Sequence, residues 1–428
     1  MNKKLLFKIL FIVICYQGSS QTNISGGIFS NTTFDIANSP YIVTDNVVLF
    51  PDVQLTIEPG VEIKFNTGKQ MEIRGELIAI GNMTSRIVFT SNNTPPSRGD
   101  WNGIKIKNSL GAKASFEYCD FSYATSSNNT ECCWDGGPIY YKNSRFDNNQ
   151  SAMTGYTGYD IDIDNCEFTN NIYCITSADK NITNSTFTNN DYGLYSTERV
   201  DVSNSTFTNN QNALYGGRGL LENCIITNNV IGVDSFFEGF EIRSCNISNN
   251  EIGIKTSNYD GYTAPIKDNQ ICNNTIFNVE NTDNINKDLT KNCWCLEDQN
   301  SIEEKLKDAF DNLNLGLISY SIYDTNCEII SSEVIKDRTL SINEDFDIVL
   351  NKPSIGPNPF LNNLSINLEQ TVAELTINIY SFTGQIVYSL INHNISETEI
   401  NLQNLNSGIY MMNLTFGNRI INKKLVKK

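Results

Sequence analysis

Apolar and polar positions between residues 116 and 274 repeat with a period of about 20 residues. An Asn-Asn pair marks each repeat, and the first members of the pairs are Asn148, Asn170, Asn189, Asn209, Asn228, Asn249 and Asn273. Two places before each pair stands a large apolar residue: Phe146, Phe168, Phe187, Phe207, Ile226, Ile247 or Ile271. Two places earlier again stands a smaller residue: Ser144, Cys166, Ser185, Ser205, Cys224, Cys245 or Asn269. This alternation is typical of β-strands, and the fixed period is typical of stacked coils.

Two further apolar columns complete each repeat. One precedes the smaller residue by three places and comprises Phe116, Tyr141, Ile163, Ile182, Val202, Leu221, Ile242 and Ile266. The other follows each Asn pair by four places and comprises Ile175, Leu194, Leu214, Val233 and Ile254. Three short strands per repeat predict an all-β fold, a right-handed parallel β-helix whose coils hydrogen-bond at a spacing of about 4.8 Å.

Leucine-rich repeats have a similar period, and residues 161–168 resemble their strand. The half-repeat after each Asn pair, however, is rich in Gly, Tyr, Ser and β-branched residues, as in residues 193–197. That composition disfavours the return helix of a leucine-rich repeat.

Asparagine suits such coils for two reasons. It tolerates the left-handed backbone of a sharp bend, and a stacked amide can donate to one neighbour and accept from the other. A further column contains Asn143, Asn165, Asn184, Asn204 and Asn223, with Ser244 and Asp268 beyond. We interpret this column as an internal asparagine ladder with an architectural role.

Both ends of a stack must be covered because they leave unpaired strand edges. Four upstream segments predict an N-terminal β cap and the first coils: residues 39–45, 55–65, 75–81 and 87–90. Downstream, Ser301 and Glu304 form a capping box. Apolar residues then recur at helical spacing as Ile302, Leu306, Phe310 and Leu313. The sequence therefore predicts one amphipathic helix as the C-terminal cap.

Residues 1–20 have the composition of an export signal. Three lysines precede or interrupt an apolar run, and Gly18 and Ser20 are the small residues before an expected cut at Gln21. Beyond this segment the chain has no apolar stretch that predicts a membrane span. Removal of the signal leaves 28 basic and 48 acidic residues, a net charge of −20. Such a chain is not expected to bind nucleic acid through phosphates.

Eleven cysteines follow the signal segment, and export permits disulfides. Cys119, Cys166, Cys224 and Cys245 occupy the small inward column, so we expect buried thiols there. The disulfide candidates are Cys132 and Cys133 in an inserted loop, and Cys293, Cys295 and Cys327 near the cap. The single histidine, His393, disfavours zinc.

The densest acidic segment contains Asp160, Asp162, Asp164 and Glu167, whose carboxylates we expect on one outer face. Lys142 and Arg145 lie one coil before it, and Lys180 lies one coil after it. Asp162, Asp164, Lys142 and Arg145 are therefore catalytic candidates, and the four carboxylates are candidate Ca²⁺ ligands. No other cofactor is expected. Solvated surface charges on an acidic protein would give the same pattern.

Aromatic residues offer a second kind of site. Tyrosines and the loop 132–137 are candidate stacking platforms for sugar rings, and those tyrosines are Tyr140, Tyr141, Tyr156, Tyr159, Tyr192, Tyr195 and Tyr215. We expect several of them, Tyr141 above all, to be core residues. Outward Thr pairs at 186/188 and 206/208 resemble ice-binding ladders, but the column is broken by Glu167, Ile225 and Asn246.

These residues carry a family resemblance over roughly residues 26–327. The segments 55–60 and 100–104, the Asn-Ser/Cys-x-Phe-Thr-Asn-Asn coils and the Asn292-Cys293-Trp294 ending resemble right-handed β-helix, pectin-lyase-like proteins common on bacteroidetes surfaces. The resemblance specifies the fold better than the activity. It leaves two interpretations open: a non-catalytic protein that binds glycans or surfaces, and a polysaccharide lyase that uses the 160–167 face with Ca²⁺.

The composition changes after residue 327. Residues 328–353 have the character of a linker, and residues 354–428 alternate as short strands that predict a small antiparallel β-sandwich. This region resembles the type A C-terminal sorting domain of the type IX secretion system. The residues that carry the resemblance are Pro357, Asn358, Pro359, Gly384, Gly408, Tyr410, Lys423, Lys424, Lys427 and Lys428. The resemblance implies that the type IX machinery delivers the protein to the cell surface or the medium. We also expect a monomer, with carbohydrate as a further partner.

Overall fold

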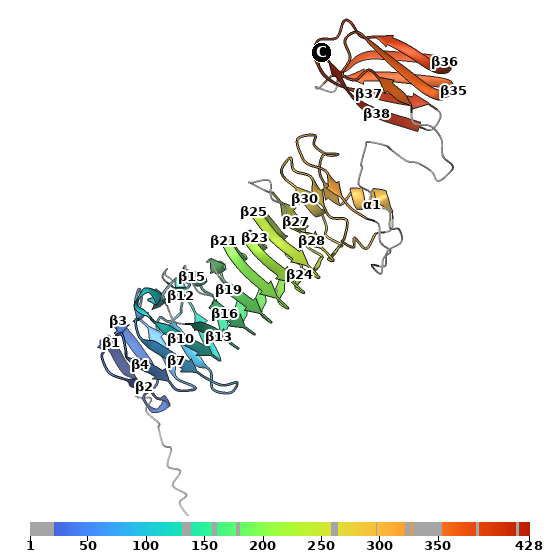
Figure 1. Cartoon of the computed structure of the whole chain (residues 1–428). Helices are drawn as coiled ribbons and strands as arrows, with labels where there is room; N and C mark the ends of the chain where they lie inside the picture. Colours follow the sequence, from blue (N-terminus) through green and yellow to red (C-terminus); the bar gives the residue numbers. More distant parts are fainter. Residues whose placement is uncertain are drawn as a thin grey trace, which may run out of the picture. The chain divides into compact units, whose positions relative to one another are not determined.

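The computed structural model describes residues 21–130, 138–155, 161–176, 180–257, 264–296, 298–321, 327, 353–381, 385–416 and 419–428. The chain forms two compact units, and each is described by itself. The first unit is a stack of coils whose strands pair in parallel with those of the next coil, so the predicted parallel β-helix is confirmed (Figure 1). Its strands form three ladders that run along the axis of the stack.

The first ladder begins near the N-terminus and contains one strand of each coil. Its members, in spatial order, are β2 (Thr32–Phe34), β4 (Gln54–Ile57), β7 (Glu76–Ile80), β10 (Lys113–Glu117), β13 (Ile139–Lys142), β16 (Ile161–Asp164), β19 (Lys180–Thr183) and β28 (Ile266–Lys267). Between β19 and β28 the ladder is formed by the second halves of long strands: β21 (Tyr192–Ser203), β23 (Asn212–Glu222) and β25 (Ile231–Arg243).

The second ladder follows the first after a bend. Its members are β5 (Glu62–Phe65), β8 (Ile87–Ser91), β11 (Cys119–Ser122), β14 (Arg145–Asp147), β17 (Glu167–Thr169), β20 (Thr186–Thr188), β22 (Thr206–Thr208), β24 (Ile225–Thr227), β26 (Asn246–Ser248) and β29 (Gln270–Cys272).

The third ladder contains the first halves of β21, β23 and β25. Its other members are β6 (Gln70–Ile73), β9 (Gly103–Ile106), β12 (Ser126–Thr130), β15 (Ser151–Gly155), β18 (Tyr173–Thr176), β27 (Ile252–Thr256), β30 (Phe277–Asn281) and β32 (Leu306–Lys307). Strands β1 (Thr22–Ile28) and β3 (Tyr41–Leu49) span the second and third ladders. Two short 3₁₀ helices lie at Ile36–Asn38 and Asn108–Leu110.

The predicted apolar columns fill the interior of the stack, because every side chain named for them in the sequence is buried. The aromatic members stack from coil to coil. Phe168 and Phe187 have ring centroids 4.6 Å apart, and Phe187 and Phe207 have centroids 4.4 Å apart, with interplanar angles of 1° and 5°. In-register parallel pairing places identical residues one strand spacing apart, so the sequence repeat becomes a continuous aromatic stack.

The prediction of an internal ladder at Asn143, Asn165, Asn184, Asn204 and Asn223 is wrong. These residues are half-buried or exposed, and they adopt left-handed backbone with φ between 50° and 54°. Their side chains therefore point outward at the bend between the first and second ladders. The residue after each of them points inward instead: for example, the Ser205 hydroxyl accepts a hydrogen bond from the Ser185 N–H (3.1 Å).

The internal ladder consists of the second Asn of each pair: Asn149, Asn171, Asn190, Asn210, Asn229, Asn250 and Asn274. The Asn210 Oδ1 accepts hydrogen bonds from the backbone N–H and the side-chain amide of Asn190, both at 3.0 Å. The Asn210 Nδ2 donates to the Phe187 carbonyl at 3.0 Å and to the Asn229 Oδ1 at 2.9 Å. Each buried amide thus finds partners in neighbouring coils, which removes the penalty for burying it.

Asn210→Ala is expected to lower the free energy of unfolding by roughly 2–4 kcal/mol, because it leaves buried donors and acceptors in two neighbouring coils unpaired. The matched control is Asn209→Gly. Asn209 has φ of 57° at the same bend, a backbone conformation that glycine adopts without strain. Guanidinium denaturation of both variants checks the prediction, and similar midpoint shifts would contradict it.

The C-terminal end of the stack differs from the predicted amphipathic helix. Helix α1 spans only Gln299–Glu303, and its N-cap is Asp298, whose carboxylate accepts a hydrogen bond from the Ser301 N–H (2.9 Å). Leu306 is buried in strand β32, which pairs with β30 of the last coil. Phe310 and Leu313 are exposed. The open edge of β30 offers backbone hydrogen bonds to this segment, so a strand replaces further helical turns. A two-stranded pair, β31 (Lys287–Asp288) with β33 (Ile318–Ser319), completes the cap.

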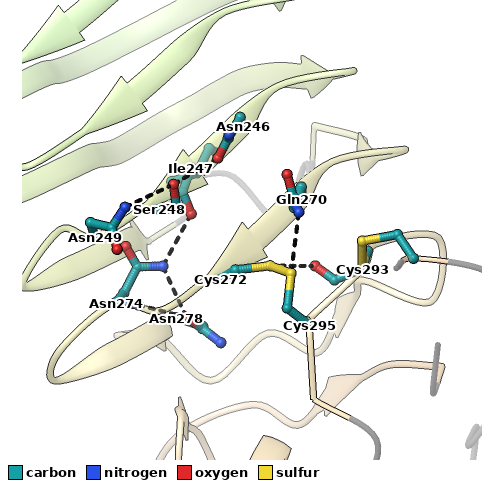
Figure 2. The surroundings of a disulfide bond; sticks show 11 residues. Asn246, Ile247, Ser248, Asn249, Gln270, Cys272, Asn274, Asn278, Cys293 and Cys295 are labelled. Atoms are coloured by element: carbon teal, nitrogen blue, oxygen red, sulfur yellow. Dashed lines mark hydrogen bonds between the residues drawn. A yellow bond between two sulfur atoms is a disulfide. The ribbon is translucent and has the colours of Figure 1, made fainter. Parts of the chain in front are cut away.

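Two disulfides join this cap to the last coils. Cys272 bonds to Cys295 and Cys293 bonds to Cys327, with Cα–Cα distances of 5.6 and 5.3 Å. Figure 2 shows Cys272 meeting Cys295 beside Gln270 and Cys293. The expected participation of Cys293, Cys295 and Cys327 is confirmed, whereas the partner Cys272 was not among the candidates. The other candidates, Cys132 and Cys133, lie outside the described residues.

The thiols of the small inward column are buried and unbonded, as predicted: Cys119, Cys166, Cys224 and Cys245. Burial raises the pKa of the Cys166 thiol to about 12, so it is protonated at neutral pH and unreactive.

The second unit is a five-stranded antiparallel sheet with its own apolar core. Its strands are β34 (Ser354–Gly356), β35 (Asn363–Tyr380), β36 (Ile386–Asn401), β37 (Gly408–Phe416) and β38 (Arg419–Lys427). The segments predicted as separate strands around Leu364 and Leu375 belong to the single strand β35. It pairs with β34 and β36 in its first half and with β36 and β37 in its second half.

Candidate functional site

The predicted carboxylates Asp162 and Asp164 lie on the outer face of the first ladder, on β16. In register they pair with Tyr140 and Lys142 of β13, and those residues pair in turn with Ser115 and Glu117 of β10. Labels β10, β13 and β16 mark this region in Figure 1. Alternate residues of a strand share one face, so side chains from three coils converge there.

A shallow groove of about 300 Å³ lies at this place. It is lined by residues of four coils: Ile80, Ser115, Phe116, Glu117, Tyr140, Tyr141, Lys142, Asp162 and Asp164. Tyr140 is 45% exposed, and among the described residues no aromatic ring stacks on it. The lining thus combines apolar and charged side chains with a ring on which no described ring stacks, and this combination suits a sugar ligand.

Hydrogen bonds from the next coil hold both groove carboxylates. Asp162 accepts from the Asn181 amide at 3.2 Å, and Asp164 accepts from the Thr183 hydroxyl at 2.9 Å and from the Asn184 amide at 2.8 Å. Lys142 lies in register between Glu117 and Asp164. No described carboxylate is within ion-pair distance of its ammonium, so that group is available to a ligand.

Arg145 and Glu167 do not belong to this groove, which corrects the expectation of one shared acidic face. The left-handed bend at Asn165 separates β16 from β17, so Glu167 projects from the second ladder. There it forms an ion pair with Arg145 at 3.0 Å, and both side chains are about half exposed. Lys180 is buried at an inward position of β19, level with Ile161. Asp160 lies outside the described residues.

The described carboxylates do not converge on a point where a metal ion would sit. In the described part of the chain, the cluster of three potential ligands is Cys272, Cys293 and Cys295, all of which are in disulfides. The proposal of a Ca²⁺ site at residues 160–167 therefore stays a prediction.

The other tyrosines form a cluster on the third ladder that differs from the expected platforms. Tyr173 stacks on Tyr192 at 5.2 Å, and Tyr195 stacks on Tyr215 at 4.9 Å. The stacks meet edge to face, as between Tyr192 and Tyr195 at 5.2 Å. Each of these rings thus has one face covered by another tyrosine ring. Tyr141 is a core residue as expected, and Tyr156, Tyr159 and loop 132–137 lie outside the described residues.

A second hollow, which the sequence analysis did not identify, lies on the first ladder near the C-terminal cap. It has a volume of about 380 Å³ and is lined by Ala264, Pro265, Ile266, Lys267, Asn286, Asp288, Thr290 and Lys291. Neither Lys267 nor Lys291 forms an ion pair with a described carboxylate. Both ammonium groups thus line this hollow in a chain of net charge −17.

The predicted sorting residues lie in the second unit. Gly408 begins β37, and the Tyr410 hydroxyl donates to the Asn406 carbonyl at 2.8 Å. Pro357, Asn358 and Pro359 lie between β34 and β35. The lysines of the terminal segment belong to β38 or follow it, and Lys427 alone among them is buried. Gly384 lies outside the described residues.

The fold and this second unit define a parallel β-helix protein with a separate C-terminal domain. Residues 354–428 match the family model of the secretion system C-terminal sorting domain. This domain indicates secretion or attachment to the cell surface through the type IX secretion system. No helix among the described residues has the length and apolar character needed to span a membrane.

Two curated relatives match parts of the chain. The chain is 43% identical to Protein bark beetle of Drosophila melanogaster over 74 residues. The matched segment is 17% of this chain and 2% of that protein. It is 28% identical to an ulvan lyase of Nonlabens ulvanivorans over 158 residues. This segment is 36% of this chain and 27% of that protein. The chain thus spans less than a third of either relative.

Among solved structures, a periplasmic alginate epimerase has a TM-score of 0.36 and 14% identity, covering 65% of this chain and 70% of that chain. A mutant of the same epimerase has a TM-score of 0.32 and 13% identity over the same shares of the two chains.

Proposed function

We propose that the exported β-helix is a polysaccharide-binding protein whose ligand lies in the groove on the first ladder. The observation that carries the proposal is the half-exposed ring of Tyr140 beside the Lys142 ammonium, which pairs with no described carboxylate. A sugar ring presents an apolar face to an aromatic ring and hydroxyl groups to charged neighbours. Asp162 and Glu117 offer acceptors for those hydroxyls, and Lys142 offers a donor.

The site is rigid because it is built on strands. Tyr140 is flanked in register by Ser115 and Asp162, and the core beneath it is closed by Tyr141, which stacks on Phe116 at 5.0 Å. The Asp162 and Asp164 carboxylates are already oriented by the next coil. Little conformational entropy is then lost when a ligand binds.

The second hollow, which we call the lysine hollow because Lys267 and Lys291 line it, lies on the same ladder and extends this proposal. Strands β19, β21, β23 and β25 separate β16 from β28, so the two hollows are about 24 Å apart at the spacing of parallel strands. A polymer that follows the ladder reaches both. Lys267 and Lys291 favour a carboxylate or sulfate group at that end, since neither forms an ion pair with a described carboxylate.

Tyr140→Ala is expected to weaken polysaccharide binding about tenfold, which corresponds to roughly 1.4 kcal/mol for the loss of one ring contact. Affinity electrophoresis and calorimetry with a panel of neutral and uronate polysaccharides measure the effect. The matched control is Tyr195→Ala, because Tyr195 is 38% exposed but lies in the cluster on the third ladder. Equal loss for both variants, or no binding by the unaltered protein to any member of the panel, would refute the proposal.

A polysaccharide lyase is the second candidate function. It is favoured by the presence of Lys142, Asp162 and Asp164 in one groove. Such side chains could abstract the proton on the carbon next to the carboxylate of a uronate sugar. The partial similarity to an ulvan lyase agrees with this candidate. Among the described residues that line the groove there is no histidine or arginine to assist such a reaction. The absorbance of unsaturated uronate products, measured with and without Ca²⁺, distinguishes cleavage from binding.

Asp162→Asn combined with Asp164→Asn is expected to change the free energy of unfolding by no more than about 0.5 kcal/mol, because both side chains lie on the outer face and Asn keeps a carbonyl oxygen that can accept the hydrogen bonds from the next coil. Thermal melting in the presence of a chelator checks this. Repeating the melt with added Ca²⁺ tests the metal prediction. A Ca²⁺-dependent rise in Tm that the double variant lacks would favour the lyase over the binding protein.

A further inference from the structure

Cysteine sulfurs gather where the last coil joins the C-terminal cap. The Sγ atoms of Cys272, Cys293 and Cys295 all lie within 4.8 Å of one another, and Figure 2 shows these residues side by side. The disulfide from Cys293 to Cys327 brings a fourth sulfur to the same place. Cys272 and Cys293 are buried, whereas Cys295 is half-buried. We call these four cysteines the sulfur cluster.

Backbone contacts hold part of the cluster together independently of its disulfides. The Ile271 N–H donates to the Cys293 carbonyl at 2.8 Å, and the Cys293 N–H donates to the Asn269 carbonyl at 2.8 Å. Cys293 is thereby fixed beside β29, the strand that ends at Cys272. Trp294, which follows Cys293, is fully buried and anchors the same segment. None of these contacts involves sulfur, so reduction of the disulfides is expected to leave the cysteines close to one another.

The sulfur cluster has the donor set of a zinc site. Thiolates are preferred ligands of Zn²⁺ in structural sites, where four of them complete a tetrahedron without histidine. A Zn–S distance of about 2.3 Å places the sulfurs of such a site about 3.8 Å apart, and the three mutual separations here are no larger than 4.8 Å. The Gln270 side-chain amide donates to the Cys295 Sγ at 3.3 Å. Such a donor stabilises a thiolate and orients it toward a metal.

We propose that the sulfur cluster is a redox-gated zinc site: the two disulfides exclude the ion, and the four thiols that reduction forms bind it. A dithiol reductant gives two electrons and two protons to each disulfide and is itself oxidised to a disulfide. Zn²⁺ then displaces the four thiol protons and forms four Zn–S bonds. The cap is thus linked to the last coil in both redox states, by disulfides or by the metal. The inference rests neither on glycan binding nor on export.

The test uses the purified full-length chain, reduced with dithiothreitol and then desalted in the absence of oxygen. After incubation with Zn²⁺, elemental analysis is expected to find about one tightly bound ion per reduced chain and at least tenfold less zinc in the oxidised chain. Zinc is also expected to raise the Tm of the reduced chain, because the ion joins the cap to the last coil. Equal zinc binding by the two forms would overturn the site, and an unchanged Tm would overturn the link.

Alkylation followed by mass spectrometry assigns the site in the unaltered protein, so the assignment does not depend on a variant that folds. Bound Zn²⁺ is expected to slow alkylation of the sulfur cluster at least tenfold. The adjacent thiols of Cys132 and Cys133 are the control, and protection confined to them would refute the proposal. Cys295→Ser is expected to lose the zinc, whereas Cys132→Ser with Cys133→Ser keeps it. Full zinc binding by Cys295→Ser would likewise contradict the assigned ligands.

Discussion

Phe187→Ala is expected to lower the free energy of unfolding by roughly 3–5 kcal/mol, the usual cost of truncating a fully buried aromatic residue. Phe187 is 0% exposed and stacks on Phe168 and Phe207 of the two neighbouring coils. The truncation removes two ring contacts as well as buried apolar area. It also leaves a cavity that the rigid coils on either side cannot close.

Thr188→Ala is the matched control for this prediction. Thr188 follows Phe187 directly in β20, but its side chain is outward and only half-buried. Its loss is expected to cost no more than about 0.5 kcal/mol. Chemical denaturation followed by circular dichroism compares the two variants. Equal effects would show that the inward and outward positions of this strand are wrongly assigned.

Deletion of residues 328–428 is expected to abolish export and to leave the β-helix folded. The two apolar cores share no residue, since one is formed by residues between 34 and 320 and the other by residues between 360 and 425. The deletion keeps Cys327 and therefore both disulfides. It removes the complete segment that matches the sorting-domain family.

Two measurements check the deletion. The purified truncated protein should melt within a few degrees of the full-length chain, because the β-helix keeps its own caps. In a bacterium with a type IX secretion system, the truncated protein should accumulate in the periplasm, whereas the full-length protein reaches the surface or the medium. Arrival of the truncated form at the surface would contradict the sorting assignment.

Much of the candidate site could be predicted because strand periodicity is local. Alternation along β16 places Asp162 and Asp164 outward whatever the rest of the chain does. The face on which Glu167 lies could not be predicted in this way, because the left-handed residue Asn165 ends the alternation of β16 and the chain continues on another face. The free ring of Tyr140 and the lysine hollow depend on neighbours 20 or more residues away. Neither feature could be predicted from the sequence without knowing the register between the coils.

The sequence by itself determined the period of the coils, the three inward columns and the sorting domain, because each follows from spacing within a short stretch of chain. Only the tertiary structure decided which asparagine is internal. Asn209 and Asn210 are chemically identical, and the sign of φ at the first directs the amide of the second into the core. The tertiary structure also decided the partner of Cys272, because Cys295 lies beside it only after the last coil has formed. Contacts between coils are set by register and by the direction of each bend, and neither is local to the residues that it brings together.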